Sequence, residues 1–312
     1  MKMMNIYEIS NDTYFAKINL SRGANCVSLI NKQYNAHILR EPDYSKPLDN
    51  PYLYGMPILF PVNRIAGGRF TFEGREYIFP INEPNTNCHL HGVLHQMQFE
   101  IVNAGEDHVV CSYKATKMQP YLQFPHEFEV VVSYCLKENG LEQKTEIINC
   151  SSQNMPVMLG FHTTFQIPFL DKQSLDDLRI YADVTDLIER NMETYLPTGR
   201  ILQPDDVTKK LRCGEFKPNE QKISRHYKSG DVGNMCIYDV NRKLVVQYEN
   251  SANMRFRLLY NGNADEYICL EPQNCLINCL NENFGMEYSN FEYLKPGEKR
   301  AYISKISLQQ FN

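Results

Sequence analysis

Two titratable side chains, Glu271 and His162, each follow a short apolar stretch of the chain. Glu271 ends the run at residues 267–270 and precedes Pro272, and His162 comes directly after residues 157–161. Partial burial raises the pKa of a carboxyl group toward the range of a general base at neutral pH. Imidazole titrates close to that range. The two residues could therefore transfer protons, although each taken alone also fits an ordinary polar group at the end of a strand.

A second group of polar residues flanks a hairpin that the sequence predicts between residues 63 and 92. Asn63 and Arg64 precede two strand-like stretches joined by a Glu-Gly turn at 73–74, and His91 closes the segment. The hairpin would bring both ends to one cleft. A guanidinium fork and an imidazole can hydrogen-bond the hydroxyls of a sugar, and the fork can also hold a phosphate. A surface position in a loop is the alternative for Arg64.

Three histidines, His89, His91 and His95, raise the alternative of a metal site. On a strand, His89 and His91 would point to the same face, and neutral imidazoles are good metal ligands. No carboxylate lies at a suggestive spacing nearby, and Cys275 and Cys279 lack the second pair that completes a zinc site. We therefore expect no metal, and we expect His89 and His95 to be structural or exposed.

Strand patterns dominate the chain. Residues 128–134 and 141–148 flank Asn139-Gly140, a strong hairpin signal. Further strands are expected at residues 25–30, 109–113, 157–161, 243–248, 255–260, 267–270 and 300–308. Short helices are expected only at 174–178 and 204–211, and residues 203–231 read as a long polar loop region. The pattern predicts an all-β sandwich or barrel with no linker and no repeat.

Charge and composition narrow the classes of partner. The 312 residues carry 32 Lys and Arg against 37 Asp and Glu, a net charge of −5, so we expect no nucleic-acid partner. No run of about 18 apolar residues is present, which predicts no membrane span. Residues 1–20 lack the apolar centre of a signal peptide, and the ten cysteines form no Cys-x-x-Cys pair. A cytoplasmic protein with reduced thiols is expected.

Together these motifs resemble those of the aldose 1-epimerases, also called galactose mutarotases. The resemblance rests on Asn-Arg-Ile, GGRFTFEG, PINEPN and HLHG between residues 63 and 92, FEVVVSYCL at 128–136, LGFH at 159–162, CLEPQ at 269–273 and LKPGE at 294–298. It implies one domain over residues 1–312, a large antiparallel β-sandwich with few short helices. It also implies an isomerase that interconverts the α and β anomers of a free aldose without a cofactor.

The resemblance assigns roles to residues that match the family motifs. Glu271 would be the general base on the C1 hydroxyl, and His162 the general acid on the ring oxygen. His91, Arg64 and Asn63 would contact the sugar. The family's sugar-contacting aspartate has no clear match, and Asp239 and Asp231 are the candidates. The sequence departs from the family at Thr163-Thr164, where a Pro-Tyr pair is usual, and at Val93, where a second Gly is usual. Because of these departures, the family resemblance does not identify the preferred sugar.

Other functions remain open from the sequence. A hexose-phosphate epimerase of the same fold would need cations around the phosphate, for which Arg64, Arg69 and Arg75 are candidates. A non-catalytic carbohydrate-binding module would keep the cleft without needing both Glu271 and His162. A metal-dependent sandwich enzyme would use the histidines at 89, 91 and 95. The expected partner is a small sugar, and the chain is expected to be a monomer or a homodimer.

Overall fold

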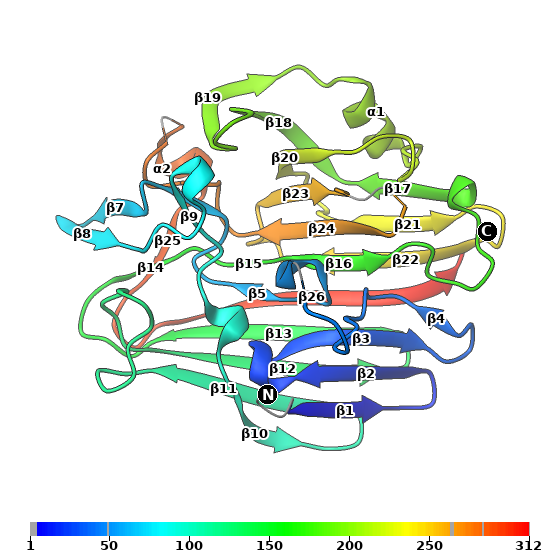
Figure 1. The fold of residues 1–312 in the computed structure, drawn as a ribbon, viewed down its shortest axis with the longest axis horizontal. Coiled ribbons are helices and arrows are strands. Elements are labelled where there is room, and N and C mark those ends of the chain that lie inside the picture. Colours follow the sequence, from blue (N-terminus) through cyan, green and yellow to red (C-terminus); the bar gives the residue numbers. More distant parts are fainter. Residues whose placement is uncertain (1–4, 49, 263–264, 283, 312) are drawn as a thin grey trace.

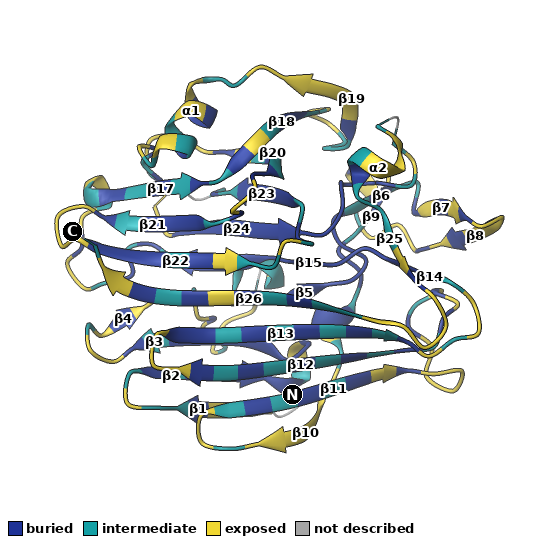
Figure 2. Ribbon diagram, turned by 180° about the vertical axis from the view of Figure 1, so that it is seen from behind, coloured by how far each residue is buried: buried dark blue, intermediate teal, exposed yellow. Residues whose placement is uncertain are grey.

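The fold consists of two large antiparallel β-sheets that pack face to face (Figures 1 and 2). The computed structural model describes residues 5–48, 50–262, 265–282 and 284–311. The first sheet runs, in spatial order, β10 (Glu100–Ala104), β11 (His108–Ala115), β12 (Phe128–Lys137), β13 (Gly140–Asn149), β26 (Lys299–Gln310), β22 (Leu244–Asn250), β21 (Met235–Asp239) and β17 (Leu178–Ala182). The second runs β19 (Pro197–Leu202), β18 (Val184–Arg190), β20 (Ser224–Ser229), β23 (Phe256–Tyr260), β24 (Tyr267–Gln273), β15 (Gly160–Phe161) and β5 (Ile58–Leu59), and β16 (Thr163–Gln166) also pairs with β24.

Smaller elements extend and cover these two layers. A four-stranded sheet of β1 (Ile6–Ser10), β2 (Tyr14–Asn19), β3 (Asn25–Asn31) and β4 (Ala36–His37) lies in front of β11–β13 in Figure 1. Three two-stranded ribbons are formed by β6 (Arg64–Ala66) with β9 (Cys88–Leu90), β7 (Arg69–Phe72) with β8 (Arg75–Ile78), and β14 (Met155–Val157) with β25 (Glu292–Leu294). The helices are α1 (Asp206–Cys213) and α2 (Gly285–Ser289), and the 3-10 turns are η1 (Leu20–Arg22), η2 (Pro51–Leu53), η3 (Pro84–Thr86), η4 (Leu94–Gln96) and η5 (Leu175–Asp177).

The hairpin of β12 and β13 shows why the sequence folds in this way. Buried and partly exposed residues alternate along both strands, as expected for strands with one face on the core. Lys137 pairs with Gly140 across the tight turn. A Cβ atom on Gly140 would lie 2.1 Å from the carbonyl oxygen of Ile306, so the residue must be glycine for β26 to pair here. The predicted hairpin, and the all-β sandwich with few short helices, are confirmed.

The prediction of a long loop over residues 203–231 was wrong in its second half. The strand β20 lies there, between β18 and β23 of the second sheet. Its sequence, Ser-Arg-His-Tyr-Lys-Ser, has little apolar character, and only His226, Tyr227 and Ser229 are buried. Backbone hydrogen bonds to β18 and β23 hold this strand in the sheet. Such pairing cannot be predicted from the hydrophobic pattern of the strand itself. The short helix within the segment is confirmed as α1, capped by the Asp205 carboxylate, which accepts from Thr208 N at 2.9 Å.

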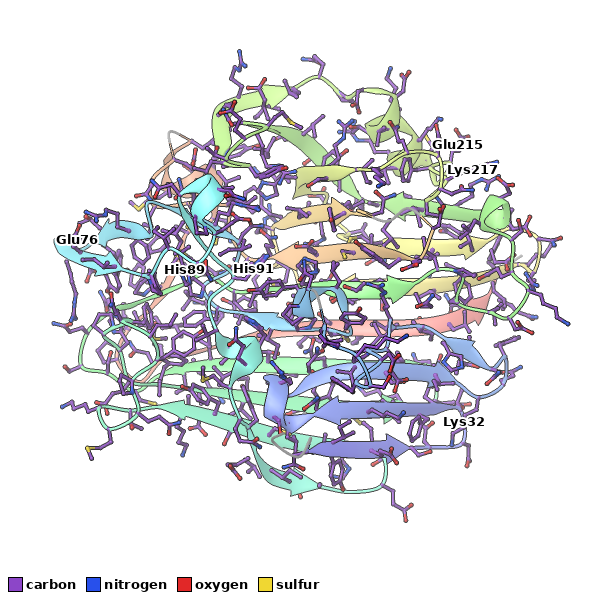
Figure 3. The ribbon with its side chains drawn as sticks, viewed as in Figure 1. Lys32, Glu76, His89, His91, Glu215 and Lys217 are labelled. Atoms are coloured by element: carbon purple, nitrogen blue, oxygen red, sulfur yellow. The ribbon has the colours of Figure 1, made fainter. Side chains whose placement is uncertain are left out.

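The hairpin of β7 and β8 projects from one side of the molecule, with Glu76 at its outer end (Figures 1 and 3). Its turn residues Glu73 and Gly74 both have positive φ, 48° and 76°, which fits the tight turn expected there. Arg69 and Arg75 are exposed on it and interact with Glu76 and Gln153. Among the described residues, neither helix is long and apolar enough to cross a membrane.

Candidate active site

A cleft of about 470 Å³ opens over the second sheet. Five of the six side chains proposed from the sequence line it, and they come from distant parts of the chain. They are Asn63, Arg64, His91, His162 and Glu271. Strands β24, β15 and β6, together with the residue that follows β9, thus converge on one place.

Glu271 lies within β24, opposite Leu258 of β23, and only 1% of it is exposed. It does not close the strand, as the sequence suggested, because pairing continues through Pro272 to Gln273. Burial raises the pKa of its carboxyl group to about 8, although the positive charges of Arg190 and Arg64 act in the opposite direction. The carboxylate is thus a protonatable group at the bottom of the cleft.

His162 faces this carboxylate from the link between β15 and β16. Its Nε2 lies 3.3 Å from Oε1 of Glu271, and its backbone N–H donates to the carbonyl of Pro57 at 3.1 Å. Burial lowers the pKa of the imidazole to about 4. The ring of Tyr52 stacks at 6.1 Å between ring centres. The position of His162 is therefore held both by its backbone and by its neighbours.

His91 lies beside His162 because the chain leaves β9 just before it. Its φ is 64°, its N–H donates to the carbonyl of Asn63 at 3.0 Å, and its ring meets His162 edge-on at 5.6 Å. Gly92 must follow, since a Cβ there would lie 1.8 Å from the carbonyl oxygen of Phe60. The expectation that His89 and His91 share a face was wrong, because the positive φ breaks the alternation of the strand. His89 instead binds the carbonyl of Pro80 through Nδ1 at 2.8 Å. Figure 3 labels both histidines.

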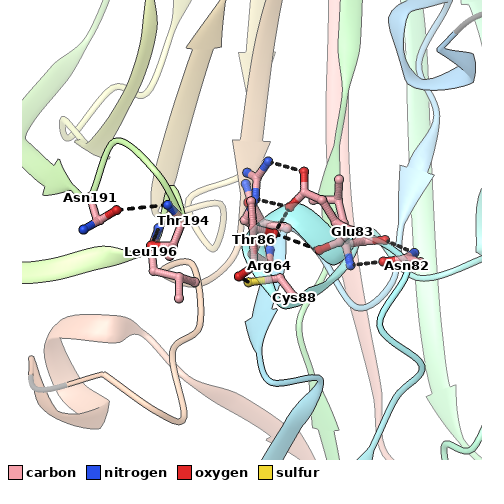
Figure 4. A network of polar contacts seen from close by, with 10 residues as sticks. Arg64, Asn82, Glu83, Thr86, Cys88, Asn191, Thr194 and Leu196 are labelled. Carbon is pink, nitrogen blue, oxygen red and sulfur yellow. Dashed lines mark hydrogen bonds and ion pairs between the residues drawn. The ribbon is translucent and has the colours of Figure 1, made fainter.

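Arg64 forms a bidentate ion pair with Glu83 at the rim of the cleft (Figure 4). Its Nε and Nη2 donate to the two carboxylate oxygens at 2.6 and 2.7 Å. Burial alone would raise the pKa of Glu83, but the bonds from Arg64 and the Thr86 hydroxyl hold it below its usual value. The guanidinium also lies 4.8 Å from the ring centre of Tyr195. Arg64 is therefore fixed in place, with its charge matched by Glu83.

Several side chains in the cleft were missed by the sequence analysis. They are Tyr52, Glu83, Arg190, Tyr195, Ser224 and Tyr260. Since the chain has no tryptophan, tyrosines were the obvious source of an aromatic surface, but nothing indicated which ones. Arg190 ends β18 and Ser224 begins β20, a strand that the hydrophobic pattern did not reveal. These residues could be placed only once the pairing of β18, β20 and β23 was known.

Asp239 lies outside the cleft. It ends β21 in the other sheet, where it is fully buried and accepts bonds from Gln173 at 2.6 Å and from Arg242 at 3.1 Å. Its other oxygen accepts the backbone N–H groups of Asn241 and Arg242. Every oxygen of this carboxylate thus has a partner in the turn that it stabilises. The candidate sugar contact at Asp239 is therefore corrected to a structural role.

The departure from the family at Thr163-Thr164 points away from the cleft. Thr163 bonds the hydroxyl of Tyr248, on the facing sheet, at 2.7 Å, and Thr164 donates to the carbonyl of His162 at 3.2 Å. Both threonines are fully buried. Neither threonine lines the cleft.

One group within the described residues has the donor spacing of a metal site: His162, Cys269 and Glu271, whose ligand atoms lie within 4.8 Å of one another. The thiol of Cys269 is fully buried and shares a hydrogen bond with the Thr164 hydroxyl. Burial, with the charge of Glu271, raises its pKa well above the usual value. Because the thiolate is the ligand form, this set is a poor metal site. The nitrogens of His89, His91 and His95 do not form such a group among the residues that the structure describes.

Comparisons with known proteins agree with this arrangement. The family model for aldose 1-epimerase matches residues 5–307. The chain is 30% identical over 220 residues to the galactose mutarotase of Rattus norvegicus, covering 67% of this chain and 59% of that one. It is 28% identical over 289 residues to the bifunctional protein gal10 of Schizosaccharomyces pombe, covering 83% of this chain and 39% of that protein. The chain thus spans less than two thirds of the length of these relatives.

Solved structures give the same result over the whole chain. A galactose mutarotase-like protein from Clostridium acetobutylicum is 27% identical, covers 100% of both chains and superposes with a TM-score of 0.92. A galactose 1-epimerase from Lactobacillus acidophilus, at 15% identity and a TM-score of 0.73, shares the fold over 98% of this chain and 94% of that one. From the family match over residues 5–307 and these similarities, the chain belongs to the aldose 1-epimerase family.

Proposed function

We propose that the protein is a mutarotase, which interconverts the α and β anomers of an aldose with a free C1 hydroxyl. The observation that carries the proposal is the pair of Glu271 and His162, 3.3 Å apart at the bottom of a cleft. A carboxylate and an imidazole at this distance can serve the two ends of one ring-opening step. A binding module would have no need to bury both groups.

The two groups together hold one proton over a broad pH range. Burial raises the pKa of Glu271 to about 8 and lowers the pKa of His162 to about 4. Between these values the pair is singly protonated and titrates as a unit. The reactive form has the proton on His162 and the charge on Glu271. Burial favours the other arrangement, with the proton on Glu271, and the positive charges of Arg190 and Arg64 act against it.

The reaction then balances with these two groups alone. The Glu271 carboxylate takes the proton of the C1 hydroxyl while the His162 imidazolium gives its proton to the ring oxygen. The bond between C1 and the ring oxygen breaks, and C1 becomes an aldehyde. Rotation about the bond between C1 and C2 presents the other face, and closure returns both protons. His91, Arg64 and Asn63 are the proposed hydroxyl contacts, and Tyr52 and Tyr195 supply ring surfaces beside them.

We further propose that residues 1–312 form one catalytic domain that binds a sugar and uses no cofactor. We also propose a cytoplasmic location, which the cysteines support. All ten are free, and seven of them are buried. Free thiols in this number suit a reducing compartment.

Polarimetry tests the activity directly. Freshly dissolved α-D-glucose and α-D-galactose relax to their equilibrium rotation in water, and the protein should speed this relaxation without changing the final value. The Glu271→Gln variant is the matched control for non-specific catalysis by protein side chains. Acceleration by the wild type alone supports the proposal. Sugar binding without acceleration, for these and for charged aldoses, would instead support a carbohydrate-binding module.

A further inference from the structure

The cleft contains one cation that no acid neutralises. Arg64 is matched by Glu83, but Arg190 has no carboxylate within ion-pairing distance among the residues that the structure describes. Its Nη2 donates to the carbonyl oxygen and the hydroxyl of Ser224, at 2.5 and 2.9 Å. Nε and Nη1 have no hydrogen-bond partner in the same set of residues. Donors on two nitrogens of a guanidinium therefore remain for a ligand.

Arg190 also lines a second pocket, of about 650 Å³, which adjoins the cleft. The two hollows share Arg190, Tyr195, Ser224 and Tyr260. The two hollows therefore adjoin at the Arg190 side chain. A substrate whose C1 lies at Glu271 could reach this junction with the far end of its ring.

The second pocket brings further positive charge. Lys222 and Arg225 line this pocket together with Arg190, and Glu189 is the acidic residue in its lining. Arg225 is paired with Asp205 at 2.5 Å, and Glu189 is paired with Arg200 at 2.7 Å. Lys222 is exposed and has no acid partner among the described residues. Two positive charges, at Arg190 and Lys222, thus stand unmatched in a protein whose net charge is −5.

We propose that this junction binds an oxyanion carried by the sugar, so that the preferred substrate is a charged aldose with a free C1. The inference rests on the proposed function and names the substrate class of the same site. A phosphate and a carboxylate both offer two oxygens that can accept hydrogen bonds from the free N–H groups of Arg190. Lys222 would add positive charge from the second pocket. Arg190 is the residue that determines this specificity. Arg69 and Arg75, the cations suggested by the sequence, lie instead on the projecting hairpin.

A neutral sugar offers Arg190 only hydroxyl groups as hydrogen-bond acceptors. A hydrogen bond to a charged oxygen is stronger than one to a hydroxyl. The alternative is that Arg190 serves only to favour the ionised form of Glu271. The two differ in a measurable way. Support of Glu271 alone would affect neutral and charged sugars equally, whereas recognition of an oxyanion would affect charged sugars selectively.

Binding is measured by calorimetry on the Glu271→Gln variant, which separates affinity from turnover. The probes are galactose against galacturonate, and glucose against glucose 6-phosphate. We expect at least one charged sugar to bind about tenfold or more tightly than its neutral partner. Preference for galacturonate alone would identify a carboxylate, and preference for glucose 6-phosphate alone a phosphate. Adding Arg190→Gln should remove the preference, because it should weaken binding of the charged sugar about tenfold more than binding of the neutral one.

Two further variants keep the test decisive. Lys222→Gln, on the exposed side of the second pocket, should reduce the preference severalfold even if Arg190→Gln does not fold. Lys209→Gln removes the same charge from the exposed face of α1, outside both hollows, and should leave the preference unchanged. Equal binding of neutral and charged sugars, or an equal loss for both when Arg190 is replaced, would overturn the proposal. Tight binding of a charged sugar that the wild type does not mutarotate would instead overturn the proposed function and leave the oxyanion site standing.

Discussion

Replacing Glu271 by glutamine removes the proposed base with almost no change in the shape of the side chain. The residue is 1% exposed within β24, so a nearly isosteric amide should keep the cleft and the sugar contacts. The amide cannot take a proton from the C1 hydroxyl. A positioned general base typically contributes about 10²–10⁴-fold to a rate, which corresponds to about 3–5 kcal/mol of barrier. We expect kcat/KM to fall by that factor and KM to change little.

The same variant should be more stable than the wild type at alkaline pH. The pKa of Glu271 is raised to about 8 from a model-compound value of 4.5. The folded protein therefore holds this proton more tightly than the unfolded chain does. Its contribution to stability is fully present below about pH 4.5 and is lost as the pH rises through about 8. Glutamine cannot ionise, so it escapes a loss that reaches, as an upper bound, the order of 5 kcal/mol.

Two measurements test this reasoning together. Polarimetry gives the activity, and thermal unfolding followed by circular dichroism gives Tm for both proteins between about pH 5 and about pH 9. The difference in Tm should grow in favour of Glu271→Gln from about pH 5 to about pH 8 and level off above that. Near wild-type activity in the variant would remove Glu271 from the mechanism. A difference in Tm that stays constant with pH would show that the carboxyl group is not held protonated by burial.

Three further changes probe the rest of the site. His162→Gln should lower kcat/KM by about 10²–10⁴-fold, and the acidic limb expected for the wild type near pH 4 should move up toward about pH 8, where Glu271 ionises; polarimetry that finds an unchanged limb would assign it elsewhere. Gly92→Ala should unfold or severely destabilise the protein in thermal melts, because its Cβ would meet Phe60 O at 1.8 Å, whereas Gly297→Ala, also at positive φ but with open space around it, should cost only about 1–2 kcal/mol; equal costs would refute the close contact. Asp239→Asn should lower Tm by a few degrees through the loss of its charged bonds and leave kcat/KM within about twofold, while a large loss of activity would return Asp239 to the site.

The sequence predicted those parts of the site that local motifs mark. Glu271 and His162 each follow an apolar stretch of the sequence, and the motif around His91 contains the glycine that its turn requires. Strands with alternating burial, such as β12 and β13, were equally visible. These features depend on neighbours within a few residues along the chain. Local sequence therefore marks Glu271 and His162 as candidates and predicts the strands around them, whereas their roles as base and acid come from the family resemblance.

The rest depends on pairing between distant segments. Arg190 and Ser224 come together because β18 pairs with β20, and β20 is too polar to read as a strand. Asp239 illustrates the opposite error. It was a candidate for the family's sugar-contacting aspartate, but β21 belongs to the other sheet and the carboxylate stabilises its own turn. The sequences of β20 and β21 contain no pattern that indicates which sheet each strand joins.

The charges near Glu271 link acid–base chemistry to the choice of substrate. Arg64 is matched by Glu83, so Arg190 is the main unmatched positive charge that favours the ionised carboxylate, with neutral His162 and His91 also nearby. An anion bound at Arg190 would cancel part of this effect and raise the pKa of Glu271.

By thermodynamic reciprocity, ionisation of Glu271 must weaken anion binding by the same factor. The affinity of the wild type for galacturonate, whose carboxylate stays ionised, should therefore fall as the pH rises through about 8. The Glu271→Gln variant should show no such fall in calorimetry. Parallel pH profiles for the two proteins would separate the oxyanion site from the base and refute the link. Divergence would mean that a charged substrate binds best to the protonated pair and reacts only after the proton has moved to His162.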